Sequence, residues 1–310
     1  MAAETLKKLW KKEYFKTLIT IALEFVIVFG LFFGASAMLG TEYPALAVAS
    51  GSMLPTLNIG DLIIVQKVSP AEVHADPLTG DILVYKRGNE LIVHRAVEIK
   101  RINDVYWFTT RGDNNYLNDP AWPETALVGK VVARIPYVGN LPLFFHSEKN
   151  MYIFLVIYLI ILVLLILPFG SSDTEKPTKK GRKLWKIDLR TASFIAIDLL
   201  IFGFLVFSLW GYLEIWQPGA SPPRAKILGM WKDLQFHESF SDVAILHLGF
   251  MTYRIDCQVD GRTRMGVPTF SWFQLSFLAF MAFNAWKILS LLKKRENWAN
   301  QPKNSGKSFM

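Results

Sequence analysis

Long apolar stretches alternate with segments of mixed polarity along this 310-residue chain. Four of these stretches contain few charged residues and approach the length of about 20 apolar residues that a helix needs to cross a bilayer. They run over residues 18–39, 151–169, 193–213 and 271–292. The pattern therefore predicts about four transmembrane helices, separated by polar segments.

The segment 41–150 contains short runs of β-branched and aromatic residues, separated by turns rich in Gly, Asp and Asn. Such runs are typical of strands. Helical periodicity of useful length is missing from the same segment. The sequence therefore predicts a small antiparallel barrel or a folded sheet, with strands at residues 61–68, 81–86, 91–99, 105–110 and 127–135.

The segment 214–270 is a second polar piece between apolar stretches. It opens with the Pro- and Gly-rich run 217–223, and its last part carries Asp260-Gly261 between two short runs of strand type. Asp-Gly between alternating runs favours a two-residue hairpin turn. A hairpin is therefore expected over residues 253–267.

The distribution of charge along the chain predicts how the chain is oriented in the membrane. The net charge is +8, and the basic residues gather at 7–16, 176–190 and 293–295, whereas 41–150 holds 10 Lys and Arg against 12 Asp and Glu. Cytoplasmic loops of membrane proteins carry an excess of Lys and Arg. Both termini are therefore expected in the cytoplasm, and the basic excess reflects topology rather than a nucleic-acid partner.

These patterns predict the organisation of the whole chain. The first apolar stretch is followed by Ala35-Ser36-Ala37, which resembles a cleavage site, but its length favours an uncleaved anchor. The expected parts are an N-terminus with helix one (1–40), an outer β domain (41–150), helix two (151–170), a basic loop (171–192), helix three (193–213), a second outer segment (214–270), and helix four with a cytoplasmic tail (271–310).

Ser52 lies just beyond the first apolar stretch, in the run Ser50-Gly-Ser-Met-Leu-Pro-Thr56. The proline restricts the residue before it to extended geometry, so this turn can hold a serine rigidly. A serine hydrolase also needs a base, a group that orients the base, and donors for an oxyanion. From spacing alone, the run Ser50–Thr56 is better explained as a structural turn at the membrane interface than as a catalytic site.

His94 interrupts an apolar strand, on the same face as Ile92 and Ala96. It is either a core histidine or a base that points into a cleft. Asp113 and Asp119 follow the next strand in a stretch rich in turn residues. Each could cap a turn through its own side chain, or could accept the imidazole N–H of a catalytic histidine.

Four motifs in this order resemble the conserved boxes of signal peptidase I. They are Ser50–Thr56, Gly60-Asp61, Gly80-Asp81 with His94-Arg95, and Arg111-Gly-Asp-Asn-Asn115, and the resemblance covers about residues 15–150. The common bacterial pattern has a lysine where His94 stands. The chain is therefore similar to the archaeal and endoplasmic-reticulum branch, which some Gram-positive bacteria also possess.

This resemblance implies a membrane-anchored serine endopeptidase with a mainly β catalytic domain. Ser52 would be the nucleophile and His94 the general base. Asp119 would orient His94, with Asp113 as its rival, and the Ser50 hydroxyl with the Ser52 N–H would form the oxyanion hole. No metal or other cofactor is implied.

The resemblance also implies the substrates and the setting. Exported pre-proteins would lose their N-terminal signal peptides through an acyl-enzyme, at a cell membrane of archaeal or Gram-positive type. The bilayer is a further expected partner and the protein translocation machinery a candidate one. A protease for a narrow set of surface proteins, and an inactive β domain that serves as a membrane scaffold, are the alternatives.

Residues 151–310 have no counterpart in the minimal pattern of that family. Cys257 is the single cysteine, so no intrachain disulfide is expected. The spacings of His237, His247 and Cys257 match no zinc pattern. Asp198 lies near one end of the third apolar stretch, where an interfacial carboxylate is the expected role.

Overall fold

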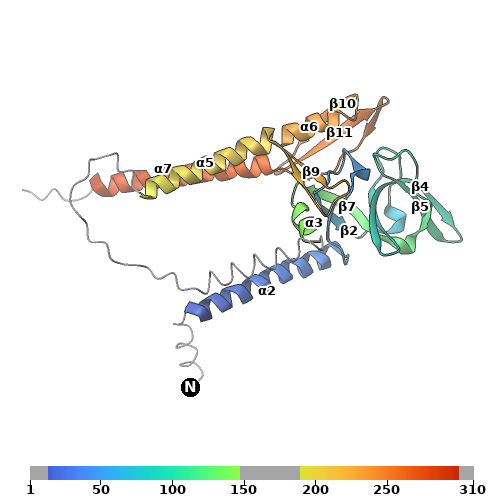
Figure 1. Ribbon diagram of the computed structural model, residues 1–310, viewed down its shortest axis with the longest axis horizontal. Coiled ribbons are helices and arrows are strands. Elements are labelled where there is room, and N and C mark those ends of the chain that lie inside the picture. The colour runs from blue at the N-terminus through green and yellow to red at the C-terminus, as the bar shows by residue number, and fades with distance from the viewer. Residues whose placement is uncertain (1–12, 147–188, 300–310) are drawn as a thin grey trace, which may run out of the picture. The chain divides into compact units, whose positions relative to one another are not determined.

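The computed structural model describes residues 13–146 and 189–299. The chain divides into two compact units, each built from several segments. The first unit contains the β domain together with residues 213–227 and 234–270, and the second contains residues 178–212, 228–233 and 271–310. The protein therefore combines a large β-sheet domain with long apolar helices (Figure 1).

The strands predicted in the segment 41–150 are confirmed, with small shifts at their ends. A further short strand precedes Ser52, and a short helix, α3 (Asn140–His146), follows the last strand. The sequence pattern did not predict that helix. The strands are β1 (Ala45–Ala47), β2 (Leu62–Gln66), β3 (Ile82–Arg87), β4 (Glu90–Ile102), β5 (Val105–Arg111), β6 (Trp122–Pro123) and β7 (Leu127–Ile135).

The segment 214–270, called the second outer segment after its predicted position, contributes its own strands. The predicted hairpin is confirmed, because β11 and β12 pair antiparallel around Asp260 and Gly261, which both have positive φ. Positive φ at both central residues is what a type I′ turn requires. The elements here are β8 (Tyr212–Trp216), β9 (Arg224–Leu228), α6 (Met230–Glu238), β10 (Val243–Leu248), β11 (Thr252–Val259), β12 (Arg262–Arg264) and β13 (Thr269–Phe270).

One sheet joins the two outer segments. Its main path runs β10-β11-β13-β7-β3-β4-β5-β6, with β2 on β7 and β1 on β2. The link is a parallel pair between β13 and β7, at Thr269 and Arg134. The path of described strands is open at β10 and β6, so it describes a folded sheet and does not close as a barrel.

Two clusters of buried apolar side chains form the core of this sheet. Val267, from the second outer segment, packs in the first cluster with residues of the β domain. Burial of such side chains stabilises the fold by about 25 cal/mol per Å² of apolar surface. The first cluster is Val48, Met53, Leu57, Ile63, Val65, Ile82, Val84 and Val267, and the second is Val68, Val73, Leu83, Tyr85, Ala96, Phe108 and Trp122.

Three helices among the described residues are long and apolar enough to cross a membrane. They are α2 (Glu13–Leu39), α5 (Leu189–Trp210) and α7 (Trp272–Ala299), with apolar spans at Ile19–Leu39, Thr191–Trp210 and Trp272–Lys293. The third predicted span ends three residues earlier than expected, because a strand begins at Tyr212. The predicted span 151–169 lies outside the described residues. The helices indicate a multi-pass membrane protein.

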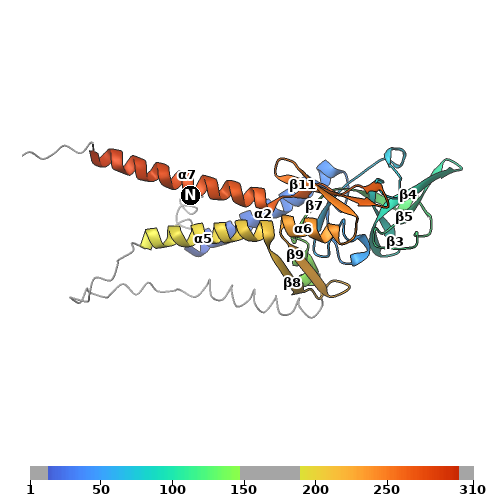
Figure 2. The ribbon, with the colours of Figure 1, turned by 90° about the horizontal axis from the view of Figure 1, so that it is seen from above.

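The helices α5 and α7 lie side by side in the second unit (Figure 2). Phe194 stacks on Phe283 with ring centroids 4.8 Å apart. The side chain of Asn284 donates a hydrogen bond of 2.7 Å to Asp198. A partner of this kind satisfies an acid within an apolar helix.

Candidate active site

Ser52 lies on a single turn of 3-10 helix, Gly51–Met53, that follows β1. Met53, the last residue of the turn, and Leu57 are both buried, and the N–H of Leu57 donates to the carbonyl of Met53 at 3.0 Å. The turn is therefore anchored in the core on one side. On the other side Ser52 is partly exposed.

His94 lies on β4, opposite Leu83 of β3, and its side chain is 9% exposed. Its Nε2 atom is 3.1 Å from the Oγ atom of Ser52. Its Nδ1 atom is 2.6 Å from Oδ2 of Asp119. The imidazole therefore bridges the serine hydroxyl and the carboxylate.

Several hydrogen bonds fix the position of Asp119. Its N–H donates to the carbonyl of Thr110 at 2.7 Å, and the Thr110 hydroxyl donates to its Oδ2 atom at 2.7 Å. Burial alone would raise the pKa of Asp119, but the hydrogen bonds from His94 and Thr110 outweigh burial and hold this pKa below its ordinary value. Asp119 is therefore ionised at neutral pH.

The charge on Asp119 fixes the tautomer of His94. An ionised carboxylate can only accept hydrogen bonds, so Nδ1 of His94 must carry a hydrogen and donate it. In the neutral imidazole, Nε2 then has a free lone pair that faces the hydroxyl of Ser52. This is the arrangement that a general base requires.

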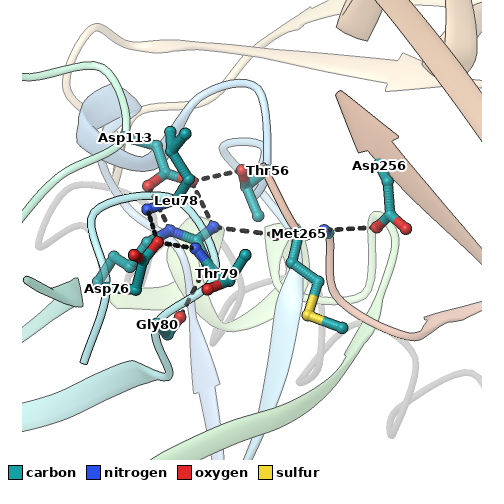
Figure 3. Close-up of polar contacts among 10 residues, drawn as sticks. Thr56, Asp76, Leu78, Thr79, Gly80, Asp113, Asp256 and Met265 are labelled. Atoms are coloured by element: carbon teal, nitrogen blue, oxygen red, sulfur yellow. Dashed lines mark hydrogen bonds and ion pairs between the residues drawn. The ribbon is translucent and has the colours of Figure 1, made fainter. Parts of the chain in front are cut away.

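Asp113 lies elsewhere, in a buried ion pair (Figure 3). Arg95 donates from Nε and Nη2 to the two carboxylate oxygens, each at 2.8 Å, and the Thr56 hydroxyl donates to Oδ2. Burial would raise the pKa of Asp113, but the charge and hydrogen bonds of Arg95 reverse this and lower it. The structure thus brings Asp119 to His94 and gives Asp113 a different partner.

Arg95 also reaches two backbone carbonyls. It donates from Nη1 to Gly80 at 2.9 Å and from Nη2 to Met265 at 3.1 Å. Met265 follows β12 in the second outer segment, so this segment contacts the ion pair directly. The sequence motif contained Arg95 but gave no indication of these partners.

Two further residues, which the sequence motif 111–115 contained without an assigned role, hold the serine turn. Asn114 donates from its backbone N–H to the carbonyl of Ser52 at 2.9 Å, and from its side chain to the carbonyl of Gly51 at 3.1 Å. A Cβ atom on Gly112 would lie 2.5 Å from the same Ser52 carbonyl. The close approach of the two loops therefore requires glycine at this position.

The expected oxyanion donors lie next to the serine hydroxyl. The Oγ atom of Ser50 is 3.3 Å from the Oγ atom of Ser52. The N–H of Ser52 belongs to the first turn of a short helix, where such groups have no acceptor within the helix. Both groups can therefore donate to an oxygen that develops charge beside Ser52.

A cavity of about 360 Å³ lies beside this triad. Small and apolar side chains dominate its wall, which includes the end of β1 and the start of β4. A groove lined by residues of strands suits an extended peptide with small side chains. The lining residues are Ala47, Val48, Ala49, Ser50, Ser52, Met53, Leu57, Glu90, Leu91, Ile92, Val93 and His94.

The remaining candidates from the sequence lie in other settings. Cys257 is a free, buried thiol, and burial raises its pKa. His247 pairs with Asp256 at 3.1 Å, and His237 is buried in α6. Residues 13–146 and 189–299 contain no group of three side chains suited to hold a metal ion.

Comparison with known proteins identifies the family. The chain is 30% identical over 145 residues to the human signal peptidase complex catalytic subunit SEC11C, an alignment that covers 43% of this chain and 73% of that protein. It is 31% identical over 159 residues to the sec11 subunit of Dictyostelium discoideum, an alignment that covers 45% of this chain and 86% of that protein. It is also 32% identical over 147 residues to the SEC11 subunit of Clavispora lusitaniae, an alignment that covers 44% of this chain and 84% of that protein.

The chain therefore belongs to the signal peptidase I family, in the branch that contains the SEC11 catalytic subunits. No protein-family model matches the chain. Each of these three alignments leaves more than half of the chain without a counterpart. The family likeness thus extends over a part of the protein only.

Proposed function

We propose that this protein is a membrane-bound serine endopeptidase that removes N-terminal signal peptides from exported pre-proteins. The observation that supports this most strongly is the position of His94, 3.1 Å from the Ser52 hydroxyl and 2.6 Å from the Asp119 carboxylate. The relationship to signal peptidase catalytic subunits supports the same reaction class.

In the proposed mechanism, Ser52 Oγ attacks the scissile carbonyl carbon while Nε2 of His94 takes the hydroxyl proton. The imidazolium then gives this proton to the leaving amine as the C–N bond breaks, which leaves the signal peptide as an ester on Ser52. A water molecule then gives a proton to Nε2 of His94 and attacks the ester carbonyl. The imidazolium gives this proton to Oγ of Ser52 as the ester C–O bond breaks, which frees the signal peptide as a carboxylic acid and restores the serine. Asp119 stabilises the imidazolium in both halves of the reaction.

The remaining polar groups have supporting roles in this proposal. The N–H of Ser52 and the hydroxyl of Ser50 stabilise the negative oxygen of the tetrahedral intermediates. Asp113 holds Arg95 and Thr56 and thereby fixes the loops around the serine turn. Its contribution is structural, because its carboxylate is engaged by Arg95 and its side chain is 2% exposed.

The groove beside Ser52 supports a substrate with small side chains before the cut. Its wall contains Ala47 and Ala49 next to larger apolar residues, so it presents an apolar surface to the substrate. Signal peptides with small residues at the first and third positions before the cut fit this wall. Their apolar segment would lie in the bilayer, and the translocation machinery would deliver them.

The proposed topology has both termini and the basic segment 171–192 in the cytoplasm, and the site outside. The excess of Lys and Arg at 176–190 supports it. A cysteine introduced in that segment should stay unlabelled when intact cells are treated with an impermeant thiol reagent, whereas a cysteine at Ser69 should be labelled. Labelling of the first position would contradict this topology.

Two alternatives remain separate hypotheses. An inactive scaffold would not need a complete set of hydrogen bonds among Ser52, His94 and Asp119. A protease restricted to a narrow set of surface proteins would use the same chemistry. Substrate range distinguishes the second alternative from general signal peptidase activity.

The decisive experiment uses the full chain in detergent with several pre-proteins and N-terminal sequencing of the products. Cleavage at one bond after the signal peptide is expected. Ser52→Ala and His94→Ala should each reduce it by about 10⁶, the usual cost of removing either group from a serine protease, while the exposed control Ser69→Ala should cleave normally. Cleavage by Ser52→Ala would disprove the mechanism, and cleavage of one precursor only would favour the narrow protease.

A further inference from the structure

The strand before Ser52 has one edge that does not face its neighbour β2. Val48 exchanges hydrogen bonds with Asp61 and Gly60, and Pro44 accepts from Val65. Backbone groups along a strand alternate in direction, so those of Ala47 and Ala49 point away from β2. This second edge borders the groove beside the triad.

The second outer segment occupies the end of that edge. The N–H of Ser221 donates to the carbonyl of Ala49 at 2.8 Å, and Ser221 forms a parallel β-bridge with Ser50. An extended peptide that pairs with this edge can therefore extend past Ala47 but meets Ser221 beside the serine turn. The chain after the scissile bond must then pass over Ser221 and Pro222.

A second cavity, of about 230 Å³, is lined by residues that follow the serine turn and by residues of the second outer segment. Its lining includes Leu54, which follows Met53 of the first groove, and Pro222, which follows Ser221. The two cavities thus share the segment around the serine turn, and Pro222 of the second cavity is next in the chain to Ser221, which bridges Ser50. The second cavity lies where a peptide that leaves Ser52 across Pro222 would continue.

The chemistry of this second cavity is apolar with a basic rim. Leu54, Ile59, Pro222 and Phe236 supply most of its apolar wall. Lys226 lies 4.8 Å from the centre of the Phe236 ring. The wall suits one apolar side chain, and the ring is large enough to contribute much of the contact.

The rim carries two cations and one carboxylate. Arg224 pairs with Glu214 at 3.5 Å in an exposed ion pair, and Lys226 adds the second positive charge. The rim therefore has an excess of one positive charge. An acidic residue next to the apolar one complements this charge.

From these observations we infer that residues 214–226, together with Phe236, build a subsite for the leaving side of the substrate. Its occupant is an apolar side chain among the first three residues after the scissile bond, preferably followed by an acidic residue. The inference rests on the proposed peptidase function and gives the second outer segment a role in substrate selection.

The test uses precursors that are identical up to the scissile bond. Each of the first three positions after the scissile bond carries either leucine or glycine, one position at a time. The residue that follows this position is either Glu or Lys. The ratio of kcat/KM between two precursors is measured on one enzyme sample, so it does not depend on how much of a variant is folded. The wild-type enzyme should prefer leucine over glycine at one position, and Glu over Lys after it.

Two variants and one control variant test the proposed subsite. Phe236→Ala should reduce the leucine preference by roughly tenfold, the low end of what apolar pockets provide. Lys226→Glu on the exposed rim should turn the preference for Glu into one for Lys, by about threefold. Lys100→Glu, a charge reversal at another exposed lysine, on β4, should leave both ratios unchanged.

The outcomes separate the subsite from the function on which it rests. Unchanged ratios in Phe236→Ala and Lys226→Glu, with all precursors cleaved, would overturn the subsite alone. A wild-type enzyme that cleaves no precursor would overturn the proposed function and the subsite with it. Ratios that shift in the two variants and stay constant in Lys100→Glu would support both.

Discussion

Asp113 and Asp119 lie six residues apart after the same strand, yet their surroundings differ completely. Asp119 accepts from His94, and its side chain is 15% exposed. Asp113 is paired with Arg95, and its side chain is 2% exposed. The comparison teaches that two identical carboxylates in one loop can serve reaction and stability separately, because different partners reach them.

The same contrast holds for the cause of their lowered pKa values. Both carboxyls lose solvation on burial, which alone would raise the pKa. For Asp113 a permanent positive charge compensates this loss. For Asp119 hydrogen bonds donated by His94 and Thr110 do so, and in the proposed mechanism His94 becomes an imidazolium during the reaction. Asp119 can therefore respond to proton transfer, whereas Asp113 cannot.

The largest expected effect comes from exchanging each carboxylate for an amide. Asp119→Asn should lower kcat by about 10⁴, because the amide can donate to Nδ1 and favour the wrong tautomer of His94. Asp113→Asn should keep most of the activity per folded molecule. Precursor cleavage, normalised to the folded fraction, measures both. The reverse result would exchange the roles assigned to the two residues.

The second effect concerns stability. Asp113→Asn breaks a buried pair and should destabilise the protein by about 3–5 kcal/mol at neutral pH. The stabilisation by Asp113 is complete above the ordinary pKa of 3.8 and is lost as pH falls through its lower folded value. Thermal unfolding in detergent should therefore show the gap between wild type and variant closing below about pH 4. A gap independent of pH would contradict this.

The smallest effect tests the two hydroxyls that support these carboxylates. Thr56 donates to Asp113 and Thr110 to Asp119, and both side chains are buried. Thr56→Val should cost about 1–3 kcal/mol of stability with unchanged activity per folded molecule. Thr110→Val should also lose activity, by about tenfold, which corresponds to one hydrogen bond. Equal activity losses in both variants would contradict the different roles proposed for Asp113 and Asp119.

The sequence predicted the strands well because each is short, β-branched and bounded by turn residues. The strand expected at 127–135 is β7 without change, and the turn at Asp260-Gly261 forms as expected. Local preferences act over a few residues, so such features are readable one segment at a time. The parallel pair of β13 with β7 joins residues 134 and 269, and a local pattern cannot encode that pairing.

The same division applies to Ser52, His94 and the two aspartates. The sequence determined which side chains are available: a serine in a rigid turn, a histidine in an apolar strand and two acids in one loop. The tertiary structure decided which acid meets His94 and which meets Arg95. The reason is physical, since hydrogen bonds are made over about 3 Å, and only the folding of β4, β5 and the serine turn against one another brings these groups within that distance.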